Sequence, residues 1–233
     1  MDDIDLLVRS SQLEAVCSFL RAHGFESAQR HDGLFTGRDL TLDLHVDLVN
    51  GDRIQARAHA VRMDWESARL QSTPGMTALV LGTEDAILYT ALHSLRHSFR
   101  RLTWFVDFYL LLKSQPDWQA IECRALQRNS MKSVHYCLRY LEEHLSRPVP
   151  GAPTTAALPR LGWSEAFLLR RLSATQPESE WGEILWSFSC DSMAAKASFL
   201  WEFLFPKPAV LMQVFPRIPR VPIPLAYGLR AVQ

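Results

Sequence analysis

The chain has 233 residues, 48% of them hydrophobic and 21% charged, and its 25 basic and 25 acidic residues give a formal net charge of zero. This composition is typical of a globular chain that buries a substantial core as one large or two small domains, and the balanced charge excludes broad attraction to nucleic acid or anionic membranes. The four cysteines show no CxxC spacing, which predicts reduced thiols. The acidic N-terminus does not have the form of a secretory signal, and no run reaches the roughly 20 apolar residues of a transmembrane segment. We therefore expect a cytoplasmic protein.

Two stretches near the N-terminus, residues 2–8 and 40–48, alternate acidic and apolar residues with the period of a half-buried β-strand. Asp3 and Asp5 project from one face of the first, and Asp43 lies opposite a complete apolar face of leucines and valine in the second. If the two strands are neighbours, these carboxylates gather on one surface, where they repel one another unless they are solvated or hold a cation. The pattern therefore favours a divalent metal site, and a solvated strand face is the alternative.

Between these strands, Ser11 to Glu14 has the form of a capping box, and Gly24 is a plausible helix stop. Turn residues at 32–33 and 37–39 divide residues 25–49 into a small antiparallel meander, in which the glycines serve the turns. We therefore expect an α+β fold class, with a small mixed or antiparallel sheet and a flanking helix over residues 1–80.

From Thr83 onward the periodicity is helical, and Thr83 is the expected N-cap of a helix with Glu84 and Asp85 in its first turn. Further helices are expected over 102–112, from Asp117 to Gln127, over 131–145, near 163–173 and over 179–205. The resulting domains are an α+β core over 1–80, a helical domain over 81–147, and further helices over 148–205 after a proline-rich linker at 148–153.

The C-terminal arm, residues 206–233, has six prolines between Pro206 and Pro224 among apolar and basic residues. Proline at this density excludes a regular helix or a central strand. An exposed apolar arm of this kind would dock onto a protein partner or a membrane surface. The alternative is a tail laid across the helices of the same chain.

The two acidic strands resemble a known family. The run Asp3-Ile4-Asp5-Leu6-Leu7-Val8, followed by Leu42-Asp43-Leu44-His45, is similar to the metal site of polymerase-β-type nucleotidyltransferases. It resembles more narrowly a bacterial group described only as uncharacterised nucleotidyltransferases, which later pieces such as Leu92-His93, Leu102 to Asp107 and Leu204-Phe205-Pro206 also fit.

The resemblance implies Mg²⁺-dependent transfer of a nucleoside monophosphate from an NTP to an acceptor hydroxyl, with release of pyrophosphate. Asp3, Asp5 and Asp43 would hold two Mg²⁺ ions, and Asp43 would also orient or deprotonate the acceptor hydroxyl. His45 would contact substrate or hydrogen-bond a metal-bound carboxylate, with a strand-face histidine of no special role as the alternative. The acceptor could be a small molecule, a protein side chain or an RNA end, although the neutral charge gives no strong nucleic-acid signal.

A second group of candidate residues lies on the helix that follows Thr83. His97, Arg96 and Arg100 would line the nucleotide pocket, because the planar guanidinium can bind two phosphate oxygens at once. The spacing of His93 and His97 could also hold a transition metal, but no third ligand is evident, and a solvated basic face is the remaining alternative.

One expected feature of the superfamily is missing from the sequence. A Gly-Ser pair that cradles the nucleotide phosphates would lie about ten residues before Asp3, upstream of Met1. Its lack predicts either a further N-terminal segment or a weakened or inactive protein that acts as a nucleotide- or partner-binding module. A toxin-like transferase that modifies a cellular target is a third alternative.

Overall fold

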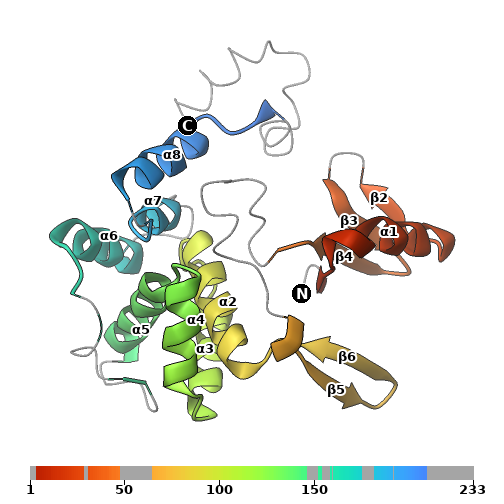
Figure 1. Ribbon diagram of the computed structural model, residues 1–233, viewed down its shortest axis with the longest axis horizontal. Coiled ribbons are helices and arrows are strands. Elements are labelled where there is room, and N and C mark those ends of the chain that lie inside the picture. Colours follow the sequence, from red (N-terminus) through yellow and green to blue (C-terminus); the bar gives the residue numbers. More distant parts are fainter. Residues whose placement is uncertain are drawn as a thin grey trace. The chain divides into compact units, whose positions relative to one another are not determined.

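The computed structural model describes residues 4–28, 31–47, 65–145, 152–153, 158, 160–174, 181–190 and 192–208. The chain divides into two compact units, one formed by Met1–Val61 with Ser198–Gln233 and the other by Arg62–Ala197. Figure 1 shows the elements of both units, and each unit is described here by itself.

The first unit contains a four-stranded sheet in the order β1-β4-β3-β2. Its strands are β1 (Ile4–Leu7), β2 (Glu26–Ala28), β3 (His31–Gly37) and β4 (Leu40–His45). Strand β1 pairs with β4 in parallel, and the β2–β3 and β3–β4 pairs are antiparallel. The predicted small mixed sheet and its meander are confirmed, and the two acidic strands are neighbours.

Helix α1 (Leu13–Ala22) flanks this sheet and follows a short 3₁₀ turn at Ser10–Gln12 (Figure 1). The predicted capping box is wrong, because the N-cap is Gln12 and no side chain of the described residues caps the helix. The helix does stop as predicted, with Gly24 at a positive φ of 85° that a glycine adopts without strain. Side chains of α1 and the sheet form one small core: Val8, Cys17, Leu20, Phe35, Leu42 and Leu44.

The alternation of β4 decides which of its side chains face that core. Leu42 and Leu44 are buried at 8% and 6% exposure, so the intervening Asp43 projects from the opposite face. The predicted complete apolar face is wrong at its ends, because Leu40 and Val46 are 47% and 45% exposed. The strand ends at His45, and Leu48, the last residue of the predicted strand, lies outside the described residues.

The second unit opens with a 3₁₀ turn at Trp65–Ser67 and a hairpin of β5 (Arg69–Thr73) and β6 (Met76–Val80). This hairpin was not predicted from the sequence. The sequence did contain a turn signal between the two strands, the Pro74-Gly75 pair, and Gly75 has a φ of 90° in the structure.

Helix α2 (Thr83–Arg96) lies at the centre of the helical unit and contacts α3, α4, α5 and α7. Its predicted stripe is buried, with none of its members more than 2% exposed: Ile87, Leu88, Ala91, Leu92 and Leu95. The predicted helices over 102–112, 117–127 and 131–145 are confirmed as α3 (Leu102–Lys113), α4 (Trp118–Gln127) and α5 (Met131–Leu145). The N-cap of α2 is Gly82 rather than the predicted Thr83.

Three further helices follow along the chain: α6 (Trp163–Ala174), α7 (Trp181–Ser187) and α8 (Met193–Leu204), the last of which crosses from the second unit into the first at Ser198. The single helix expected over 179–205 is therefore two helices, and turns after Ser187 separate them. Glycine at 182 permits close packing, because a Cβ there would lie 2.2 Å from the Leu95 carbonyl oxygen of α2.

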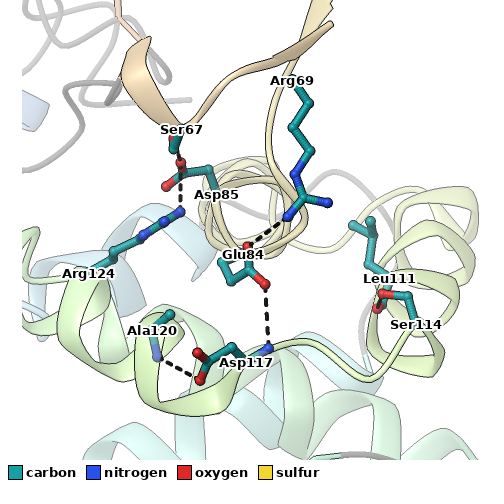
Figure 2. Close-up of polar contacts among 9 residues, drawn as sticks. All are labelled: Ser67, Arg69, Glu84, Asp85, Leu111, Ser114, Asp117, Ala120 and Arg124. Carbon is teal, nitrogen blue, oxygen red and sulfur yellow. Dashed lines mark hydrogen bonds and ion pairs between the residues drawn. The ribbon is translucent and has the colours of Figure 1, made fainter. Parts of the chain in front are cut away.

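A buried ionic cluster fixes the start of α2. Asp85 is fully buried and accepts hydrogen bonds from Arg124 at 3.0 Å, from Arg128 at 2.6 Å and from the Ser67 hydroxyl. Figure 2 shows the Ser67 and Arg124 contacts around Asp85. The cluster joins the segment before the hairpin, the first turn of α2 and the last turn of α4.

The neighbouring Glu84 makes weaker contacts at the same place. It pairs with Arg69 of β5 at 3.8 Å and accepts a 3.4 Å hydrogen bond from the Asp117 backbone N–H (Figure 2). These distances are long for an ion pair and a hydrogen bond, so Asp85 rather than Glu84 provides the strong contacts of this junction.

No helix within the part of the chain that the structure describes is both long and apolar enough to cross a membrane. Most of the predicted linker and all but residues 206–208 of the predicted C-terminal arm lie outside the described residues.

Candidate metal centre

The parallel pairing of β1 with β4 places two acids side by side. Asp5 is directly opposite Asp43 in this register, so their side chains leave the sheet on the same face. His45 lies two residues beyond Asp43, and the period of the strand places it on that face too. Because Leu42 and Leu44 occupy the core face, this polar group faces away from the core.

The three side chains converge closely. The Nε2 atom of His45 lies 3.0 Å from Oδ1 of Asp5 and 3.2 Å from Oδ2 of Asp43. Each residue offers one donor atom, and these three atoms lie within 4.8 Å of one another. Asp43 and His45 are only 14% and 15% exposed, whereas Asp5 is 45% exposed, so the group opens to solvent on the Asp5 side.

Gly33 contributes space beside this group. It was expected to be a turn residue, but it lies within β3, and a Cβ added there would sit 2.6 Å from the Leu44 carbonyl oxygen and 3.5 Å from Oδ1 of Asp43. A side chain at this position would clash with the Leu44 carbonyl oxygen and so shift the backbone next to Asp43, whereas its contact with the Asp43 carboxylate would be an ordinary van der Waals one. This role was not predicted from the sequence, where a glycine inside an alternating strand was the available signal.

The donor group fits a divalent cation. The His45–Asp5 contact is a hydrogen bond in this structure. Its length and that of the His45–Asp43 contact are also close to the separation of about 3.0 Å between two ligands at adjacent corners of an octahedron with bonds of about 2.1 Å. Carboxylate oxygens are the ligands that Mg²⁺ and Mn²⁺ prefer, and imidazole adds a nitrogen donor. Asp3, the third predicted carboxylate, lies outside the described residues.

The other predicted binding residues form a second group in the helical unit. The rings of His93, His97 and Trp104 contact one another, with centroids 4.6 Å apart for His93–His97 and for His93–Trp104, and 5.2 Å apart for His97–Trp104. The guanidinium of Arg101 lies 5.6 Å above the Trp104 ring. We call these four residues, with Arg96 and Arg100, the ring–arginine cluster.

The imidazole of His97 is neutral near neutral pH. Its pKa is lowered from 6.5 to about 3, first by burial and then by the charges of four neighbours: His93, Arg96, Arg100 and Arg101. His97 therefore offers this cluster a flat neutral ring, and its arginines supply the positive charge.

Comparison with known proteins shows the family of this chain. Residues 1–146, more than half of the chain, match a family described as an uncharacterised nucleotidyltransferase, and the chain belongs to that family. This match includes the sheet with Asp5, Asp43 and His45 as well as helices α2 to α5. No curated protein and no solved structure matches the chain.

Proposed function

We propose that this protein is an Mg²⁺-dependent enzyme that transfers a nucleoside monophosphate from an NTP to an acceptor hydroxyl and releases pyrophosphate. The convergence of Asp5 and Asp43 at one point of the sheet, in a chain of a nucleotidyltransferase family, is the observation that supports this proposal most directly. The acceptor is a small molecule, a protein side chain or an RNA end.

In the proposed reaction Asp5 and Asp43 hold the divalent ions, and Asp3 of the same alternating stretch adds a third carboxylate. Bound Mg²⁺ would neutralise charge on the triphosphate and activate the attacking hydroxyl. Asp43 is the less exposed of the two described acids and is covered by its neighbours, which suits it to hold one orientation while it accepts the proton of the acceptor hydroxyl. Gly33 allows β3 to lie close to the Leu44 carbonyl oxygen, next to Asp43.

We further propose that the ring–arginine cluster contributes to nucleotide binding. A nucleobase has the flat face that stacks on Trp104 and the neutral His97 ring, and its phosphates suit the forked guanidinium groups of Arg96 and Arg100. This proposal predicts that Arg100→Gln raises the KM for the NTP with little change in the affinity for the free metal ion.

A turnover assay tests the proposed activity. The full chain is incubated with Mg²⁺ and each α-labelled NTP beside panels of small hydroxyl compounds, proteins and RNAs, and both labelled product and pyrophosphate are measured. Asp43→Asn, a near-isosteric change, should abolish both signals, whereas Asp39→Asn in the β3–β4 turn is the matched control and should leave them unchanged. Equal turnover in Asp43→Asn and the parent chain would overturn the proposal.

A further inference from the structure

The imidazole of His45 is the donor closest to both carboxylates of the metal centre. Its Nε2 atom lies 3.0 Å from the Asp5 oxygen and 3.2 Å from the Asp43 oxygen. A cation seated between these two oxygens therefore lies within reach of a nitrogen as well. Asp5 and Asp43 on their own would offer only oxygen.

The position of this ring is fixed by the strand that bears it. The Val8 N–H donates a 2.7 Å hydrogen bond to the His45 carbonyl oxygen, and β4 has a partner strand on either side. The side chain is only 15% exposed, so little of it is open to solvent. The strand therefore holds the backbone of His45, and the contacts with Asp5 and Asp43 hold its ring beside the two carboxylates. A ring held on both counts loses little entropy when an ion binds.

We infer that His45 is a direct metal ligand that makes this centre bind Mn²⁺ more tightly than Mg²⁺, while either ion can serve the proposed reaction. The inference rests on the proposed metal-dependent function and specifies which ion its carboxylate site prefers. Mg²⁺ is hard, favours oxygen and dehydrates reluctantly, whereas Mn²⁺ accepts carboxylate oxygen and also binds imidazole nitrogen. A donor set of two carboxylates and one imidazole is therefore better matched to Mn²⁺.

Pulsed electron paramagnetic resonance (EPR) tests this assignment, because a ¹⁴N nucleus bound directly to Mn²⁺ modulates the electron spin echo. The full chain is freed of metal, then titrated with Mn²⁺ with and without a non-hydrolysable NTP, and Mg²⁺ affinity is obtained by competition. Three proteins are compared: the parent chain, His45→Asn, which replaces nitrogen by a neutral oxygen donor, and His23→Asn as the control. His23 is an exposed histidine whose ring bonds to the Phe19 carbonyl oxygen.

We expect ¹⁴N modulation in the parent chain and in His23→Asn, and its loss in His45→Asn. Because loss of even an outer-shell partner costs roughly 10- to 100-fold in metal affinity, His45→Asn should weaken Mn²⁺ binding at least that much, with a smaller change for Mg²⁺. Mn²⁺ bound without ¹⁴N modulation would overturn the inference and leave the carboxylate site intact. No Mn²⁺ binding by the folded parent chain, with or without nucleotide, would overturn both the inference and the proposed function.

Discussion

Replacement of Asp85 by asparagine should strongly destabilise the helical unit. Asp85 is fully buried, and its partners Arg124 and Arg128 are 27% and 12% exposed, so solvent screens these ion pairs poorly. Asp85→Asn keeps the side-chain volume but leaves two partly buried guanidinium groups without their counter-charge. Breaking a buried ion pair from one side costs about 3–5 kcal/mol, and the expected loss of unfolding free energy lies in that range.

Urea unfolding followed by circular dichroism of the helices measures this loss. For a chain of this size, a change of about 3–5 kcal/mol corresponds to a decrease in Tm of roughly 6–20 °C. Glu84→Gln is the matched control, because Glu84 is the adjacent acid and its partner Arg69 is 65% exposed and 3.8 Å away, so its loss should cost at most about 1 kcal/mol. Equal losses in the two variants would refute the argument that burial makes the Asp85 contacts dominant.

Three further predictions concern stability. Burial and the charge of Arg139 lower the pKa of His135 from 6.5 to about 4, so the unfolded chain takes up this proton first and stability should fall as pH falls from 6.5 towards 4; His135→Leu should reduce that slope in thermal melts. Asp117→Ala removes a carboxylate that accepts two backbone N–H groups at 2.9 and 3.1 Å at the start of α4, which should cost about 1 kcal/mol in urea unfolding. Gly182→Ala forces a methyl group against the Leu95 carbonyl and should cost about 1–3 kcal/mol in the same assay.

A specific result would contradict each of these three stability predictions. An unchanged pH slope in His135→Leu would mean that other groups set the acid sensitivity of the fold. An Asp117→Ala chain as stable as its parent would show that solvent replaces the cap without loss. Full stability of Gly182→Ala would show that α7 moves away from α2 at no cost.

The helices of this chain were predictable because their signals are local. The apolar stripe of α2 has the helical period, and the Asp117 cap precedes α4 directly, so composition and spacing locate both elements. The β5–β6 hairpin was missed because its strands alternate weakly and expose large apolar residues such as Leu70 and Met76, which removes the usual pattern.

The candidate site was predictable in part. Alternating acids identified Asp5 and Asp43 as partners, but only the parallel register, a long-range property, places them directly opposite each other. The central position of His45 and the space left by Gly33 depend on that register and on a neighbouring strand, so neither follows from local spacing. The position of Asp85 in the first turn of α2, at the positive end of the helix dipole, was likewise predictable from the sequence. Its burial was not, because its partners Arg124 and Arg128 lie about forty residues away along the chain.

A calorimetric titration of the chain with each Mg·NTP, beside Asp5→Asn, tests the central claim most directly. The account predicts binding that requires Mg²⁺, prefers one base and is lost in Asp5→Asn, because that variant removes one of the two described carboxylates proposed to hold the ion. Thermal melts of both proteins establish that they are folded. Binding of equal strength in the parent chain and in Asp5→Asn, or no binding by the folded parent chain, would contradict the account.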